Sequence, residues 1–432
     1  VKKYLEERGE SAGNAELDRL TLGCVGVRRT TGQHPGGLVV VPDDMDVEDF
    51  TAVQHPADDP DSDTVTTHFE YHCMEDNLLK LDMLGHDDPT MIRMLEDLTG
   101  VNARAIPLDD PDTMSIFTSS KVLGFENDEI LGPTGAVAIP EFNTRFTRGM
   151  LMDTMPKDFN TLVRLSGFSH GTDVWLGNAR DLIVSGTATV LETVGCRDDI
   201  MLYLISMGLD PKMSFKIMEA VRKGKVKKGG FQEGWEEAMR EHQVPDWYIG
   251  SLAKIGYLFP KAHAVAYVMM AFRIAWFKVH EPLAFYATFF SIRAKAFDAE
   301  YCCAGMDAVK QKIREIENNK DATDVEQNLL VTLEVCYEFY LRGFHFDTIS
   351  IYDSDATHFR ITDNGLLPPF VTVRGLGETA ALDTVEKRKG KTFISVEEFA
   401  TTCNKLSKTH IEQLKALGAF AGMADTSQVS LF

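Results

Sequence analysis

The sequence lacks any apolar run long enough to cross a membrane, and it lacks the cysteine pairs of a disulfide framework or a zinc ribbon. Its most apolar stretches, residues 264–272 and 282–292, stop at Arg273 and Arg293, short of the roughly 20 apolar residues that a membrane helix needs. The seven cysteines are odd in number and include no CxxC pair, which is typical of a reducing compartment. We therefore expect a cytoplasmic protein without a membrane partner.

Positive charge is also scarce, because 44 Lys and Arg face 65 Asp and Glu, which gives a net charge of −21. This balance argues against a protein that coats nucleic acid nonspecifically, since neutralising phosphates needs clustered cations. The charge is unevenly distributed, however: residues 41–70 hold ten carboxylates and no Lys or Arg, whereas residues 212–228 hold seven cations. Either run by itself is equally consistent with a solvated surface.

The residues that are present indicate a folded chain of several domains. Hydrophobic residues make up 44% and charged residues 25% of 432 positions, which is typical of globular proteins, and the length exceeds that of one ordinary core. Residues 1–88 predict a mixed α/β region, residues 89–297 are helical in their periodicity, and residues 298–422 combine helices with short strands before a tail at 423–432. The expected fold class is α+β, predominantly helical. Because the chain opens at Val1 with a charged helix, it resembles a piece of a longer protein.

The apolar strand LLKLDMLG holds the first candidate for chemistry. Side chains alternate across a strand, so Asp82 and Lys80 face away from the leucines on either side of them. A carboxylate presented beside a Gly turn can bind a metal ion. An edge-strand Asp paired with Lys80 explains the same pattern, and this alternative stays open.

Two further candidates lie in the helical region. His263 and Tyr267 are one helical turn apart and share a face, which is consistent with a binding surface or with ordinary packing. The segment AVRKGKVKKGG runs from a helix end into a cationic loop that could bind phosphates. The same cations at a helix C-terminus also complement the helix dipole, so both interpretations remain.

Three familiar motifs are rejected on their context. The run HFEYHC at residues 68–73 has zinc-like spacing for a helix, but its flanks predict a strand and no second ligand pair follows. Ser169, His170 and Asp173 are the residue types of a hydrolase triad, yet triad members come from distant segments and no GxSxG surrounds the serine. The loop TTGQHPGG lacks the GK[ST] ending of a nucleotide-binding P-loop.

The C-terminal region predicts contact with DNA and with a protein pocket. In VRGLGETAALDT, Gly375 and Gly377 flank Leu376 in a turn that opens a helix, as in a helix-hairpin-helix, where backbone N–H groups bind a phosphate. A second such unit is possible in LSKTHIEQLKALGAF, and a plain helical hairpin is the alternative. The chain ends in two apolar side chains, an unusual tail that suits docking into a pocket; the candidate peptide is Gln428, Val429, Ser430, Leu431 and Phe432.

The collinear motifs TTGQHPGG, LLKLDMLGHDDPT, SGFSHGTDVWLGNA, GCRDDIM, FPKAHAVAY and QVSLF together resemble the C-terminal part of PolC-type DNA polymerase III alpha subunits, the C-family replicative polymerases of low-GC Gram-positive bacteria. The resemblance covers essentially the whole chain. It implies the end of a palm at residues 1–88, fingers at 89–297, a helical linker with a tandem helix-hairpin-helix unit at 298–422, and a clamp-binding tail at 423–432.

The resemblance also implies residue roles. Asp82 matches one of three palm carboxylates that hold two Mg²⁺ ions for nucleotidyl transfer. Arg222, Lys223 and Lys225 match cations near the incoming deoxynucleoside triphosphate. His263 matches a proposed steric gate against the ribose 2′-hydroxyl, and Tyr267 would support it. The tail, Gln428 to Phe432, matches a sliding-clamp peptide.

This sequence departs from the family in one respect, because it contains neither of the other two palm aspartates nor the thumb, PHP and exonuclease regions. A single carboxylate does not make a two-Mg²⁺ site. We therefore expect that the chain alone does not polymerise DNA, although the resemblance implies primer-template DNA, deoxynucleotides, the sliding clamp and other replisome subunits as partners. A non-catalytic, clamp-tethered DNA-binding module is the alternative. Only the polymerase hypothesis requires deoxynucleotide binding.

Overall fold

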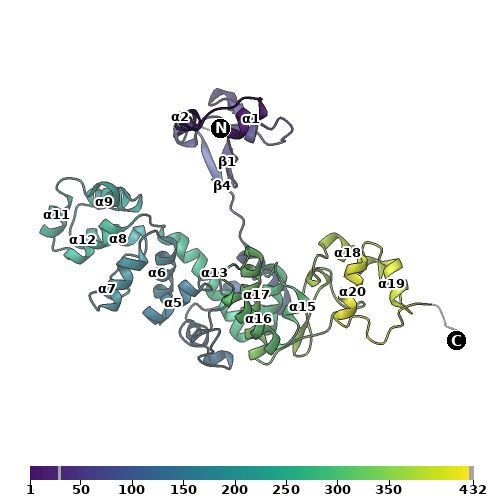
Figure 1. Ribbon diagram of the computed structural model, residues 1–432. Coiled ribbons are helices and arrows are strands. Elements are labelled where there is room, and N and C mark those ends of the chain that lie inside the picture. Colours follow the sequence, from purple (N-terminus) through teal and green to yellow (C-terminus); the bar gives the residue numbers. More distant parts are fainter. Residues whose placement is uncertain (28–30, 428–432) are drawn as a thin grey trace. The chain divides into compact units, whose positions relative to one another are not determined.

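The computed structural model describes residues 1–27 and 31–427, and it divides the chain into two compact units, residues 1–86 and 87–432 (Figure 1). The first unit joins short helices to two small antiparallel sheets, β1 with β4 and β2 with β3. The predicted strands near Leu38 and Leu79 are therefore present. The elements of this unit are α1 (Lys2–Glu7), α2 (Asn14–Cys24), β1 (Gly37–Val40), β2 (Val53–Gln54), β3 (Thr66–Thr67) and β4 (Leu79–Asp82).

The first unit has almost no core. Among its described residues only Thr51, Met74 and Leu78 are buried. The apolar pairs that β1 and β4 bring together lie in solvent: Leu38, opposite Leu81, is 58% exposed, and Leu81 is 44% exposed. Two strands without a packed face are marginally stable in water. The stability of this sheet therefore comes mainly from the hydrogen bonds between its strands and from the Gly-rich loop before β1.

The second unit is mainly helical, as its sequence periodicity predicts. Its first helices are α3 (Asp87–Thr99), α4 (Pro111–Ser115), α5 (Arg145–Thr154), α6 (Phe159–His170), α7 (Arg180–Val184), α8 (Arg197–Ser206), α9 (Pro211–Arg222), α10 (Lys225–Gly229), α11 (Trp235–Glu241), α12 (Asp246–Lys254), α13 (Lys261–His280) and α14 (Pro282–Ile292). There follow α15 (Ala299–Cys302), α16 (Met306–Asn318), α17 (Asp324–Leu341), the three-stranded sheet of β5 (His345–Phe346), β7 (Gly365–Leu367) and β6 (Arg360–Ile361), then α18 (Glu378–Lys387), α19 (Val396–Thr402) and α20 (Lys408–Ala416).

Helix α13 is the longest helix of the described chain and lies at the centre of the large hydrophobic core. By length and composition alone it could cross a membrane, which the sequence did not predict because Arg273 interrupts its apolar run. Its buried positions, among them Val268, Phe272 and Phe277, pack within that core, and α13 contacts α3, α6 and α14. Core packing accounts for its apolar composition, since a helix that is apolar on most sides is a buried one.

A buried ion pair ties α13 to α17. The Nζ of Lys278 lies 2.7 Å from the Glu338 carboxylate and donates to the carbonyl oxygens of Gly135 and Val137, at 2.8 and 2.6 Å. Both side chains are wholly buried, and burial lowers the pKa of Lys278 to about 8 while Glu338 opposes that shift. The Tyr286 hydroxyl donates to Oε1 of the same carboxylate at 2.6 Å. The charges are thus fully hydrogen-bonded, which is the condition under which a protein interior accepts them.

Candidate functional site

Three chain segments far apart in sequence meet beside the start of α13. An antiparallel bridge joins residues 172 and 257, where the N–H of Thr172 donates to the carbonyl of Tyr257 at 3.0 Å and the N–H of Gly256 donates to the carbonyl of Thr172 at 2.9 Å. Gly224, with a φ of +66°, lies so close to the Gly256 carbonyl that a Cβ would overlap it. The SHGTD loop, the KGK loop and the GYLFPKAH segment are therefore neighbours.

A row of aromatic rings follows from this arrangement. The ring of His263 lies 4.4 Å from that of Tyr267, 5.1 Å from Phe259 and 5.6 Å from His170, measured between centroids. Tyr257 continues the row, 5.2 Å from Phe259. The predicted partners His263 and Tyr267 thus share a face as expected. The structure adds His170, Tyr257 and Phe259, which no periodicity in the sequence connects to them.

A carboxylate holds His170 in place behind the row. Its Nε2 lies 3.3 Å from Glu141, which also accepts a hydrogen bond from the Ser166 hydroxyl at 3.1 Å. Its Nδ1 lies 2.7 Å from the Ser166 carbonyl oxygen, so Nδ1 carries the proton and donates it there. That nitrogen cannot act as a base toward the Ser169 hydroxyl. Since Asp173 pairs with Lys227 at 2.6 Å, the geometry contains no hydrolase triad.

The predicted phosphate-binding cations lie where α9 ends. Arg222 donates from Nε and Nη2 to the two oxygens of Glu219, at 2.7 and 2.9 Å, and Lys223 lies 3.2 Å from the same carboxylate. The hydrogen bonds from Arg222 hold the pKa of Glu219 down at about 2. Lys225 is exposed and forms no ion pair with any described residue. The backbone N–H of Leu258 donates to the Arg222 carbonyl at 3.3 Å, which connects these cations to the aromatic row at Tyr257 and Phe259.

Carboxylates of the GCRDDIM segment hold the start of α13 and of α8. Asp198 accepts a hydrogen bond from the backbone N–H of Lys261 at 2.7 Å. Asp199 accepts from the N–H groups of Gly195 and Cys196, both at 3.0 Å, and pairs with Arg164 of α6 at 3.3 Å. Sequence reasoning did not assign roles to these residues. The only signal was the motif itself, whose two acids begin a helix.

The C-terminal turn has the expected helix-hairpin-helix features. Gly375 has a φ of +76°, Leu376 is buried in the local core, and Gly377 caps α18 without help from a side chain. Within the part of the chain that the structure describes, the N–H groups of Gly375 and Gly377 donate no hydrogen bond. They are therefore available to an acceptor from outside.

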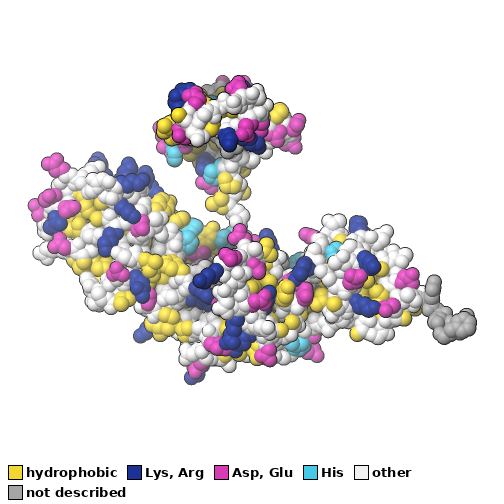
Figure 2. Space-filling view, viewed as in Figure 1, with side chains coloured by type: hydrophobic (Ala, Val, Ile, Leu, Met, Phe, Trp, Pro, Cys, Tyr) yellow, Lys and Arg dark blue, Asp and Glu magenta, His cyan; other side chains and the backbone are white. Residues whose placement is uncertain are grey.

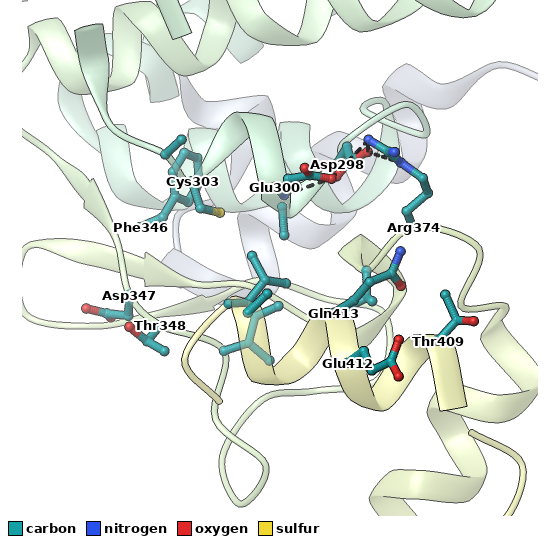
Figure 3. A pocket seen from close by; sticks show the side chains of 16 residues that line it. Asp298, Glu300, Cys303, Phe346, Asp347, Thr348, Arg374, Thr409, Glu412 and Gln413 are labelled. Atoms are coloured by element: carbon teal, nitrogen blue, oxygen red, sulfur yellow. Dashed lines mark hydrogen bonds and ion pairs between the residues drawn. The ribbon is translucent and has the colours of Figure 1, made fainter. Parts of the chain in front are cut away.

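Arg374, next to this turn, is 52% exposed and pairs with two carboxylates at the start of α15. Its guanidinium lies 2.7 Å from Asp298 and 3.2 Å from Glu300, and it stacks over the ring of Tyr301. Figure 3 shows Asp298, Glu300 and Arg374 on one side of a cavity of about 570 Å³, whose opposite side is lined by α20 at Glu412 and Gln413. The pair with Asp298 connects the turn to α15.

Comparison with known families accounts for most of these features. Residues 88–243 match the family model of the bacterial DNA polymerase III alpha subunit finger domain, and residues 2–85 match that of the bacterial DNA polymerase III alpha NTPase domain. Residues 343–429 match a helix-hairpin-helix motif. The chain corresponds to a region of PolC-type DNA polymerase III.

Similar curated proteins agree with this assignment. Proteins named DNA polymerase III PolC-type from Caldanaerobacter subterraneus subsp. tengcongensis, Halalkalibacterium halodurans and Bacillus cereus are 55%, 51% and 52% identical over 433 aligned residues. Each alignment covers all of this chain and 30% of the relative. The chain thus spans about a third of the length of these PolC-type proteins. The family resemblance and the mainly helical fold class are confirmed.

Asp82, the predicted metal ligand, lies in the first unit at the end of β4. It is about half exposed and forms an ion pair with Lys80 at 3.1 Å, as the alternative interpretation expects. Among the described residues there is no group of three His, Cys, Asp or Glu side chains that could hold a metal ion. These residues alone do not fit a two-Mg²⁺ site, since Mg²⁺ requires several converging oxygen ligands.

Two other candidates from the sequence are the histidines of HFEYHC and the C-terminal tail. His68 lies 2.7 Å from the side-chain oxygen of Gln54 and His72 lies 3.0 Å from Glu75, so the two histidines turn to different partners rather than to a shared metal. A hydrogen bond to Glu75 raises the pKa of His72. The tail, Gln428 to Phe432, lies outside the described residues.

Proposed function

We propose that this chain supplies the nucleotide-selecting and duplex-binding parts of a replicative DNA-directed DNA polymerase. The observation that carries the proposal is the meeting of the α9 cations with the aromatic row at the start of α13, where the N–H of Leu258 donates to the Arg222 carbonyl at 3.3 Å between Tyr257 and Phe259 of the row. A triphosphate is bound by cations, and a sugar is selected by the shape of the surface beside it. Here the cations and the aromatic rings are neighbours. The match to the polymerase finger domain over residues 88–243 supports the same conclusion.

Arg222, Lys223 and Lys225 would bind the phosphates of an incoming deoxynucleoside triphosphate. Glu219 holds the Arg222 fork in one orientation but neutralises part of its charge, so Lys225 contributes the uncompensated positive charge at this edge. Guanidinium forks and ammonium groups both suit phosphate. The α9 C-terminus carries partial negative charge, which these side chains must also offset.

His263 would lie against the sugar. A ribose 2′-hydroxyl would collide with its ring, whereas deoxyribose would fit, so discrimination comes from a clash with the wrong substrate. Tyr267, one helical turn further on, and His170, held by Glu141, keep the ring from turning away. In this interpretation Tyr267 and His170 are positioning residues rather than groups that touch the substrate.

The turn at Gly375, Leu376 and Gly377 would bind the backbone of duplex DNA. Its N–H groups that have no acceptor among the described residues, and the start of α18 that no side chain caps, present partial positive charge. Contacts of this kind to phosphates carry no selectivity for the base sequence. We further propose primer-template DNA and, through Gln428 to Phe432, a sliding clamp as partners in the cytoplasm, together with other replisome subunits.

Asp82 would contribute one carboxylate to a Mg²⁺ site whose other ligands come from outside the described residues. We therefore propose that this chain alone does not extend a primer. A clamp-tethered DNA-binding module without catalysis is the second candidate, which the exposed Asp82–Lys80 pair and the helix-hairpin-helix match favour.

Deoxynucleotide binding separates the two candidates. We expect the full chain to bind a deoxynucleoside triphosphate, Arg222→Gln to weaken that binding at least tenfold, and Arg314→Gln, which removes a half-exposed arginine of α16, to change it less than twofold. In His263→Ala the preference for deoxy- over ribonucleotide should fall. Duplex binding without any deoxynucleotide binding would instead favour the clamp-tethered module.

A further inference from the structure

A groove of about 330 Å³ runs between α9 and the loop before α11, on the outer side of the α9 cations. It is lined by Phe215, Lys216, Glu219, Ala220, Lys223, Lys225, Gln232 and Trp235. Arg222 is not among the lining residues, whereas Lys223 and Lys225, assigned above to the incoming nucleotide, also line this groove. Phe215 and Lys216 have no role in the nucleotide site proposed above.

The groove is the centre of a local positive charge in an acidic protein. Residues 211–232 hold seven Lys or Arg and one carboxylate, Glu219, so the local charge is 7 − 1 = +6 in a chain of net charge −21. Glu219 is already paired with Arg222 and Lys223. Within the described parts of the chain, Lys216 and Lys225 form no ion pair. Figure 2 shows Lys and Arg side chains gathered over α9 on the face drawn.

An exposed aromatic ring accompanies these lysines. Helix α9 buries Ser214, Ile217, Met218 and Val221, the positions expected for one amphipathic face. Phe215 lies on the other face and is 51% exposed, whereas Trp235, at 6%, forms a fixed wall of the groove. An exposed aromatic ring thus lies beside lysines that form no ion pair with the described residues. Aromatic rings flanked by cations are the features with which proteins bind single-stranded nucleic acid.

We infer that this groove binds a nucleotide of single-stranded DNA, with the base stacked on Phe215 and a flanking phosphate on Lys216. An unpaired base presents a free face, whereas a base inside a duplex is stacked between its neighbours, so the groove selects single strand over duplex. The amide of Gln232 can hydrogen-bond a base edge. The inference deepens the proposed function by giving the same chain a contact to unpaired DNA next to the deoxynucleotide site, and it does not require Arg222 or His263.

The test is fluorescence anisotropy of a labelled oligodeoxythymidylate with the full chain. Stacking of one base predicts that Phe215→Ala weakens binding by about five- to hundredfold, while Phe215→Trp retains it. Replacing Lys216 by Gln should lower the slope of log affinity against log salt by about 0.7, the value for one phosphate contact to a single strand. Phe146→Ala and Lys320→Gln, which remove an exposed ring and an exposed lysine elsewhere, serve as matched controls and should stay within twofold.

Two outcomes would overturn the inference. In the first, Phe215→Ala, with an unchanged melting temperature, binds the oligonucleotide as tightly as the parent chain. In the second, it loses binding of free deoxynucleoside triphosphate as much as binding of the oligonucleotide, which would assign the groove to the incoming nucleotide. Both are independent of the Arg222→Gln result, so failure of this groove and failure of the proposed function remain distinguishable.

Discussion

The Glu219–Arg222 pair shows at the scale of single residues how the candidate site is organised. The carboxylate takes two hydrogen bonds from one guanidinium and contacts Lys223, so it fixes the direction of both cations at the end of α9. Because solvent still reaches both side chains, which are 19% and 24% exposed, we expect the pair to orient these side chains rather than to contribute much to stability.

The pKa of Glu219 provides a direct test of this arrangement. Its value of about 2 lies below the ordinary 4.5, so the pair stabilises the folded state above about pH 4.5, and this contribution is lost as the pH falls toward 2. Replacing Arg222 by Gln should return the pKa toward 4.5, since Arg222 is the main cause of the shift. Carboxyl titration by NMR measures both values, and Glu233, an exposed carboxylate nearby, serves as an internal control. An unshifted Glu219 in the parent chain would contradict the geometry.

At the scale of elements, the close approach of α6 to the loop before α8 places the SHGTD loop beside the start of α13. Gly167, inside α6, lies directly against Gly195, and a Cβ there would overlap the Gly195 carbonyl. The same loop carries the N–H groups of Gly195 and Cys196, which donate hydrogen bonds to Asp199. A glycine in a helix interior ordinarily weakens it, so its presence here is explained by this contact.

A pair of glycine substitutions tests the contact. We expect Gly167→Ala to lower the free energy of unfolding by about 1–3 kcal/mol, because the added methyl group forces the helix and the loop apart. Gly149→Ala, inside α5 with open space around its Cβ position, should instead raise it by about 0.5–1 kcal/mol. Urea denaturation measures both. Equal effects of the two substitutions would mean that α6 does not lie against the loop as described.

At the scale of the whole molecule, the two units differ in how much they bury. The first unit exposes the apolar side chains of both its longer strands, whereas the second contains a continuous core and the fully buried Lys278–Glu338 pair. Exposed strand edges and an uncovered apolar face need a partner surface or invite association. The stability of the chain is therefore unevenly distributed.

Hydrogen exchange should reveal this difference. We expect the amides of residues 1–86, including β1 and β4, to exchange through opening reactions that cost little free energy, while α13 and α17 exchange only through global unfolding. Exchange followed by mass spectrometry on the full chain gives both rates in one experiment. Comparable protection of β4 and α13 would show that the first unit is stabilised by contacts beyond those described.

Local sequence patterns were sufficient for several features. The positions of α6 and α13 follow from apolar periodicity, the turn at Gly375 from its glycines, and the strands β1 and β4 from β-branched and apolar runs. The assignment of Asp82 as a metal ligand, by contrast, is not tested by its pairing with Lys80. The roles of Arg222, Lys223, Lys225, His263 and Tyr267 and the domain limits likewise remain predictions.

The amino-acid sequence alone decided the elements and the family, because helix periodicity, turn glycines and long collinear motifs depend on residues close together in the chain. Only the tertiary structure decided which of those elements share a surface. His170, Gly224 and Tyr257 are separated by more than thirty positions, and they meet because helices pack and a bridge forms between residues 172 and 257. For the same reason, the neighbours of a side chain in the sequence did not predict its contacts. Arg374 pairs with Asp298, and Phe215 is exposed to solvent.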